Sequence, residues 1–354
     1  MTENAQRNRE AEVNLLAAAR EAQWSAAAFM GPNTMKLVSP AKVNLLLAIG
    51  ARREDGYHDA DTIMHALALH DTLYLRAEGV STDELAKRVA EGGARADVAV
   101  GGPADNLVMT IDLADRTGLD LAVPAADNLA FKAADRLSRA VDRDLPEAIQ
   151  LRIEKHIPVQ GGLGGGSSNA AAVLVGLAKA WDLAADDERV ADVARSLGAD
   201  VAFFLHGGCA LLGGVGEVLQ RRLETSRRAV VLVKPAEGVS TAEAYKRFDA
   251  APRPVPEEEL ARDLAAIRAD DVALANNLAP AAEALLPELS VVRAWLAEQA
   301  GENNVLLSGS GSATFTLVDT FAEASRIATA AAARGWWARP TSLSGLRAAV
   351  APSR

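Results

Sequence analysis

The chain has 354 residues, of which 49% are hydrophobic, so it is long enough for about two domains with buried cores. Its 37 lysines and arginines against 47 aspartates and glutamates give a formal net charge of −10, which argues against a general nucleic-acid or anionic-membrane binder. Its apolar runs are too short to span a bilayer, so we expect a soluble protein. Its single cysteine, Cys209, excludes an intrachain disulfide and a cysteine-based zinc site, which favours the reducing cytoplasm.

Residues 1–34 differ from the rest of the chain. An alanine-rich helix is expected over 14–29, but its flanks are polar and of mixed charge. The continuous apolar stretch of a signal peptide is missing from this segment. We therefore interpret 1–34 as an appendage that precedes the first domain.

The first strand pattern, over 36–49, carries one polar pair among apolar residues. Lys42 and Asn44 are two positions apart, so on a strand both side chains project from the same face. A lysine that is buried without a partner is destabilising. The pair therefore indicates a functional site, and the alternative is an ordinary surface lysine on an edge strand.

Strand and helix patterns continue along the chain without strict alternation. Further strands are expected at 65–76, 148–153 and 229–233, and two strands around a turn at 304–318, with a closing segment at 336–340. Helices are expected at 128–141, 169–182, 187–197, 241–248, 257–268, 270–276, 290–299 and 320–333. The segment 78–126 is rich in glycine and acidic residues and is expected to be an insertion of moderate order with one helical turn at 83–90. This mixture predicts an α+β fold.

The segment 158–168, which we call the first glycine-rich loop, places five glycines in six positions and then two serines. Glycine allows positive φ and a close approach to an anion, and the N–H groups and the positive end of the following helix attract it. The loop predicts a phosphate cradle, with Ser167 and Ser168 at the N-cap. It has neither the Gly-Lys-Ser/Thr ending of a Walker A loop nor the spacing of the dinucleotide motif. A flexible linker is the alternative, which the flanking strand and helix disfavour.

Two later segments add polar chemistry. Asp200 follows a helix that Gly198 can end, and it either caps the next short turn or acts as a base or charge partner of Lys42. The segment 308–314, Ser-Gly-Ser-Gly-Ser-Ala-Thr, is a second glycine-rich loop, and by itself it is equally compatible with a tight turn between strands. Two such loops in one chain favour the binding of an anionic group.

These segments resemble the three motifs of the GHMP small-molecule kinases, in the same order: Ser39-Pro-Ala-Lys-Val-Asn44, the loop from Gly161 to Ala170, and Leu307-Ser-Gly-Ser-Gly-Ser312. The resemblance covers residues 36–345. It implies the GHMP kinase fold, with a domain at 35–222 like domain 2 of ribosomal protein S5, a ferredoxin-like domain at 223–348, and the active site between them. The chain departs from the family in residues 1–34 and in the length of 78–126.

Two further segments resemble those of the family members that phosphorylate a cytidyl-linked sugar alcohol: Arg53-Glu-Asp-Gly-Tyr-His58 and Gly213-Gly-Val-Gly-Glu217. The resemblance implies transfer of the γ-phosphoryl group of ATP, carried with Mg²⁺, to a hydroxyl group of that small-molecule substrate. Two alternatives stay open: another GHMP kinase that acts on a different alcohol, and a non-catalytic ligand-binding regulator with the same fold.

The motif match also implies roles for individual residues. Asp200 would be the catalytic base and Lys42 its cationic partner. The residues that would bind the substrate, by holding cytosine or lining its site, are Asn44, Tyr57, His58 and Tyr245. The residues that would bind ATP are Pro158, Gly161, Gly162, Leu163, Gly164, Gly165, Gly166, Ser167 and Ser168. Ser167 or Ser168 could approach the magnesium ion, and the histidines show no metal-site spacing.

Overall fold

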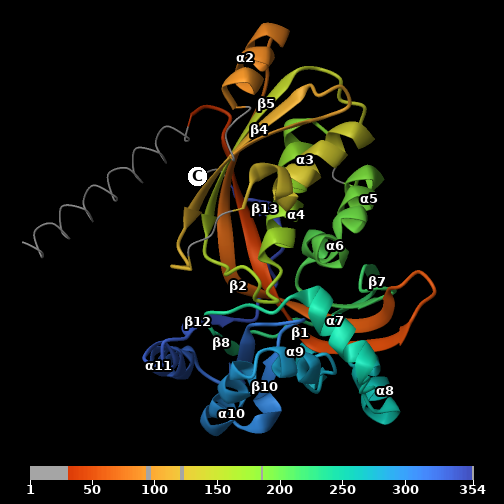
Figure 1. The fold of residues 1–354 in the computed structure, drawn as a ribbon, viewed down its shortest axis with the longest axis vertical. Helices are drawn as coiled ribbons and strands as arrows, with labels where there is room; N and C mark the ends of the chain where they lie inside the picture. The colour runs from red at the N-terminus through yellow and green to blue at the C-terminus, as the bar shows by residue number, and fades with distance from the viewer. Residues whose placement is uncertain (1–30, 93–96, 120–122, 185, 353–354) are drawn as a thin grey trace, which may run out of the picture.

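The computed structural model describes residues 31–92, 97–119, 123–184 and 186–352 (Figure 1). The helix expected at 14–29 and most of the appendage lie outside these residues. Within the described ranges, no helix is both long enough and apolar enough to cross a membrane. The described residues form two sheets, and helices pack against them.

Two long antiparallel strands, β1 (Met35–Arg52) and β2 (His58–Gly79), form the centre of the first sheet. In the described residues this sheet has nine strands, with the order β13-β1-β2-β5-β4-β3, while β6 pairs with β2 and β7, and β9 pairs with β1. The other strands are β3 (Val98–Gly101), β4 (Leu107–Asp115), β5 (Glu147–Lys155), β6 (Cys209–Gly213), β7 (Val218–Leu223), β9 (Ala275–Asn276) and β13 (Ala349–Val350). The sheet therefore includes strands from both halves of the sequence.

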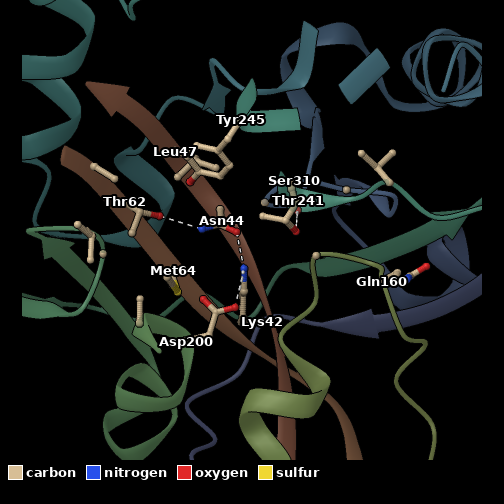
Figure 2. Close-up of a pocket in the computed structure, with 18 of the residues that line it drawn as sticks. Lys42, Asn44, Leu47, Thr62, Met64, Gln160, Asp200, Thr241, Tyr245 and Ser310 are labelled. Carbon is tan, nitrogen blue, oxygen red and sulfur yellow. Dashed lines mark hydrogen bonds and ion pairs between the residues drawn. The ribbon is translucent and has the colours of Figure 1, made fainter. Parts of the chain in front are cut away.

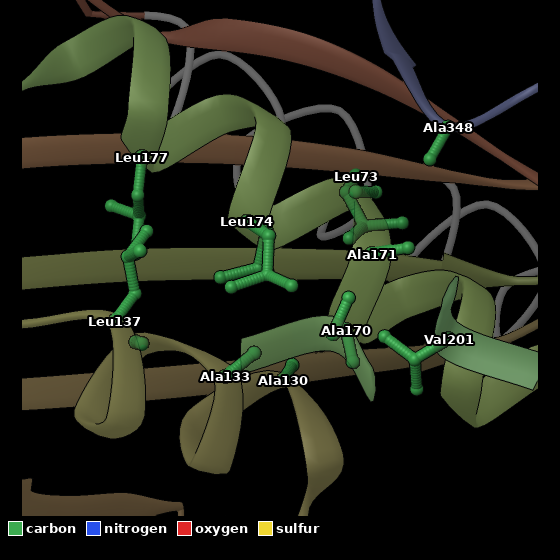
Figure 3. Close-up of a cluster of buried hydrophobic side chains, with 14 of the residues drawn as sticks. Leu73, Ala130, Ala133, Leu137, Ala170, Ala171, Leu174, Leu177, Val201 and Ala348 are labelled. Atoms are coloured by element: carbon green, nitrogen blue, oxygen red, sulfur yellow. The ribbon is translucent and has the colours of Figure 1, made fainter. Parts of the chain in front are cut away.

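Four helices cover one face of this sheet: α3 (Leu129–Ala140), α4 (Gly165–Ala180), α5 (Glu188–Leu197) and α6 (Ala199–His206). Helix α4 contacts both central strands, and about half of its buried residues are glycine or alanine. A Cβ atom at Gly176 would lie 3.0 Å from Leu37 of β1. Figure 3 shows Leu177 of α4 meeting Leu137 of α3 in the core beneath the helices. This close packing fixes the start of α4 relative to β1.

The second sheet is antiparallel and has the order β10-β11-β8-β12. Its strands are β8 (Ala229–Lys234), β10 (Val305–Leu307), β11 (Thr314–Val318) and β12 (Trp337–Ser342). Helices α10 (Glu288–Ala300) and α11 (Phe321–Ala332) pack against this sheet. The remaining helices are α2 (Thr82–Gly92), α7 (Thr241–Ala250), α8 (Glu257–Ala265) and α9 (Ala279–Leu285). The α+β prediction is confirmed.

One expectation about an individual segment is wrong, and another is incomplete. The helix expected at 270–276 is a short 3-10 turn followed by β9, which pairs in parallel with β1. The side chain of Asn276 donates to the carbonyl groups of Leu307 and Gly309, so long-range pairing replaces local helix formation here. In the described part of 78–126, α2 confirms the helical turn expected at 83–90, and the segment also contains β3 and β4, of which β4 joins the first sheet beside β5.

Candidate active site

Lys42 lies on β1 with its side chain only 4% exposed, so the surface-lysine alternative is wrong. Its Nζ donates a hydrogen bond of 2.7 Å to Oδ1 of Asn44, and Nδ2 of Asn44 donates one of 2.8 Å to Oγ1 of Thr62 on β2. The β1–β2 register shifts on both sides of this pair, between Pro40 and Lys42 and again after Asn44. Such irregularities change the direction in which side chains point, and here they lie on either side of the Lys42–Asn44 pair.

Asp200 lies in the first turn of α6, and its Oδ2 is 3.5 Å from Nζ of Lys42 (Figure 2). The N-cap of α6 is Gly198, with φ of 147°, and no side chain caps this end, so the capping interpretation of Asp200 is wrong. The carboxylate remains 30% exposed while the lysine is buried. This arrangement offers an accessible carboxylate that faces a fixed cation.

The first glycine-rich loop connects β5 to α4. The expected serine N-cap is wrong: α4 begins at Gly165 and is preceded by Gly164 at φ of 70°, a conformation that glycine adopts more readily than serine. Ser167 and Ser168 are therefore inside the first turn of the helix. Ser168 is fully buried and its Oγ accepts a hydrogen bond of 2.8 Å from Ser39, so its hydroxyl faces the interior, whereas Ser167 is half-buried.

The second glycine-rich loop connects β10 to β11 and packs directly against the first. Oγ of Ser308 donates to the carbonyl of Gly162 at 2.9 Å, and the N–H of Ala313 donates to the carbonyl of Gly161 at 3.0 Å. A Cβ atom at Gly162 would lie 1.9 Å from the Ser308 carbonyl oxygen. The linker interpretation of the first loop is therefore wrong, because both its ends and its centre are packed.

A cavity of ≈ 590 Å³ opens between these elements. It is lined by Lys42, Asn44 and Asp200, by glycines of both loops, and by Tyr245 of α7. Burial raises the pKa of the Tyr245 phenol, and the nearby Asp200 carboxylate raises it further, so the phenol keeps its proton. Asp200 is the only carboxylate among the described residues that line this cavity, and these residues contain no cluster of histidine, cysteine or acidic side chains that would hold a metal by itself.

Tyr57 and His58 do not line the cavity. Tyr57 is 64% exposed at the β1–β2 turn. The ring of His58 is buried, with Nδ1 3.1 Å from the Gly50 carbonyl and Nε2 2.9 Å from Oδ1 of Asp249, and it lies 5.7 Å from the Tyr245 ring. Both ring nitrogens thus face acceptors. No local pattern points to Asp249, which α7 brings to His58 from the other half of the chain.

Comparison with known proteins matches two stretches of the chain to sequence models of one superfamily. Residues 128–208 match the GHMP kinases N terminal domain, and residues 257–335 match the GHMP kinases C terminal domain. The first stretch contains the first glycine-rich loop and Asp200, and the second contains the second glycine-rich loop.

The 4-diphosphocytidyl-2-C-methyl-D-erythritol kinase of Desulfitobacterium hafniense is 36% identical over 301 residues, which cover 84% of this chain and 91% of that protein. The chain belongs to the 4-diphosphocytidyl-2-C-methyl-D-erythritol kinase family. The family member of Azorhizobium caulinodans is 36% identical over 315 residues, covering 86% of this chain and 97% of that protein. A crystal structure of a 4-(cytidine 5'-diphospho)-2C-methyl-D-erythritol kinase superposes with a TM-score of 0.63 at 32% identity, over 88% of this chain and 100% of the other. The GHMP kinase fold is thereby confirmed.

Proposed function

We propose that the protein transfers the γ-phosphoryl group of ATP to the 2-hydroxyl group of 4-diphosphocytidyl-2-C-methyl-D-erythritol, in the non-mevalonate route to isoprenoid precursors. The observation that carries this proposal is the Lys42–Asp200 pair, which faces a cavity bounded by two glycine-rich loops. Family membership supports the choice of substrate. A regulator that only binds a ligand would have no use for an accessible carboxylate beside a fixed cation.

In the proposed reaction the substrate hydroxyl oxygen bonds to the γ-phosphorus as the bond from that phosphorus to the β–γ bridging oxygen breaks, and ADP leaves. Asp200 accepts the hydroxyl proton. The ammonium group of Lys42, oriented by Asn44, offsets the negative charge on the transferred phosphoryl group. Phosphoryl transfer depends mainly on positioning and charge stabilisation, and these residues supply both.

The first glycine-rich loop would hold the phosphates of ATP through its backbone N–H groups and the N-terminus of α4. Mg²⁺ that arrives with ATP usually keeps several waters and binds phosphate oxygens with one or two carboxylates, where it neutralises charge. Ser167, half-buried in the first turn of α4, would approach the ion, whereas Ser168 would not, because its hydroxyl is bonded to Ser39.

The cytosine base would bind near Tyr245, whose ring lines the cavity, with Tyr57 as the second aromatic face. Stacking on an aromatic ring stabilises a bound base by about 1–3 kcal/mol. For the His58 ring to hydrogen-bond the edge of cytosine, its Nε2 must leave the Asp249 carboxylate, because its Nδ1 already faces the Gly50 carbonyl.

A reducing, cytoplasmic environment suits the chain's one thiol. Cys209 is buried on β6, and burial raises the pKa of its thiol to about 12. The thiol therefore stays protonated and unreactive, and it plays no part in the proposed chemistry.

The deciding experiment measures ADP release with the cytidyl substrate, with the same sugar alcohol lacking the cytidyl group, and with mevalonate. We expect turnover with the first alone, because a site built to bind a base rejects an analogue that leaves its polar groups unpaired. Tyr57→Ala and His58→Ala should raise KM for the cytidyl substrate and leave KM for ATP nearly unchanged. Turnover with mevalonate alone would identify a different GHMP kinase, and no turnover with any alcohol would favour the regulator.

A further inference from the structure

The carboxylate of Asp71, on β2, lies beneath the first glycine-rich loop and is fully buried. Its Oδ1 accepts hydrogen bonds from the backbone N–H groups of His156, at 2.7 Å, and Ile157, at 2.8 Å, which directly precede the loop. Its Oδ2 accepts from Nζ of Lys155 and, at 2.9 Å, from Nδ2 of Asn169, which directly follows the loop. One side chain thus contacts both ends of the loop.

Lys155 lies under the start of α4. A Cβ atom at Gly165, the first residue of that helix, would be 2.8 Å from the Lys155 Nζ. A cation beside the positive end of a helix is unfavourable, and a buried cation needs a partner. Asp71 supplies that partner, so the charge of Lys155 is balanced and the end of α4 keeps its attraction for an anion.

The same network reaches the strand that carries Lys42. Nδ2 of Asn169 also donates to Oγ of Ser39 at 2.8 Å, and Ser39 in turn donates to Oγ of Ser168 at 2.8 Å. Ser39 lies three residues before Lys42 on β1. Asp71 itself does not line the cavity, so any effect on the nucleotide must act through the position of the loop.

We propose that Asp71 is the positioning residue of the nucleotide site. It fixes both ends of the first glycine-rich loop and neutralises Lys155, so that the loop N–H groups point toward the phosphates of ATP. This inference rests on the proposed function, which places ATP at that loop. The competing explanation is a core ion pair that stabilises the fold and does nothing for the nucleotide.

The test is Asp71→Asn, in the full chain. Asparagine keeps an acceptor for the two backbone N–H groups, but its amide N–H₂ then faces two other donors, Lys155 and Asn169. We expect the Kd for a non-hydrolysable ATP analogue with Mg²⁺, measured by calorimetry, to rise at least about tenfold, because displacements near 1 Å matter this much at positioned sites. KM for ATP should rise in parallel, while KM for the alcohol stays within about twofold.

Two further variants separate positioning from folding. Asp112→Asn removes the ion pair between Asp112 and Arg152. Arg152 lies on β5, as Lys155 does, but does not contact the loop, so this variant should leave the Kd for the analogue unchanged. Asn169→Ala removes one contact of Asp71 and should weaken analogue binding about threefold or more even if Asp71→Asn does not fold.

The inference is overturned if folded Asp71→Asn binds the analogue within twofold of the wild type, or if Asn169→Ala does so when Asp71→Asn is not folded. It is also overturned if Asp112→Asn weakens binding as much as Asp71→Asn does. Analogue binding needs no acceptor alcohol. Failure of the wild type to phosphorylate the cytidyl substrate would therefore count against the proposed function and leave this test intact.

Discussion

The contact between the two glycine-rich loops can be tested by Gly162→Ala. Gly162 has φ of 69°, and an added Cβ atom would lie 1.9 Å from the Ser308 carbonyl oxygen and 3.2 Å from the Gly311 nitrogen. Real Cβ contacts are essentially never closer than 3.0 Å, so the two loops must move apart. The obstacle is backbone, which cannot rotate away as a flexible side chain can.

The size of the effect follows from this geometry. To bring the new Cβ atom from 1.9 Å to the 3.0 Å limit, the loops must separate by about 1 Å. A displacement of that size at a positioning element lowers the rate by about 10²-fold. The left-handed backbone adds about 1–2 kcal/mol of destabilisation for any residue with a Cβ atom. We therefore expect kcat/KM for ATP to fall about 100-fold, while the protein stays folded with a lowered Tm.

The assay is ADP release at saturating cytidyl substrate over a range of ATP concentrations, with thermal unfolding measured in parallel. Gly79→Ala is the matched control, because a Cβ atom there has no neighbour within 4 Å and the residue lies at the far end of β2. A kcat/KM for Gly162→Ala within about threefold of the wild type would refute the reasoning, as would an equal loss in the control.

Three other perturbations have defined outcomes. Asp200→Asn should lower kcat by about 10²- to 10⁴-fold with ATP binding nearly intact. The double variant with Lys42→Ala should lose less kcat than the product of the two single losses. If Asp200→Asn retains more than a third of kcat, Asp200 is not the base. Burial lowers the pKa of His65 to about 4 from an ordinary 6.5, so the folded state binds fewer protons than the unfolded state between these values. The free energy of unfolding should then fall as pH drops from 6.5 to 4, by roughly 3 kcal/mol, and urea titrations of His65→Gln should show a flatter profile. Deletion of residues 2–34 should leave an active enzyme, since the first core strand begins at Met35, and an insoluble or inactive product would show that the appendage is integral.

The sequence by itself determined the features that depend on a few neighbouring residues. The two-residue period of a strand put Lys42 and Asn44 on one face, and the glycine run predicted a backbone that an anion can approach. These patterns, with the order of the three motifs, were enough to predict the family and an α+β fold. They needed only local geometry, because strand alternation and glycine's access to positive φ hold wherever the segment lies.

Only the tertiary structure decided how distant segments meet. It brought Asp200 within 3.5 Å of Lys42, turned the hydroxyl of Ser168 inward and paired β9 with β1. It also joined His58 to Asp249 and placed the carboxylate of Asp71 against both ends of the loop. None of these contacts has a signal within a window of a few residues, because each depends on strand register and on how far α4, α6 and α7 approach the first sheet when their buried faces pack.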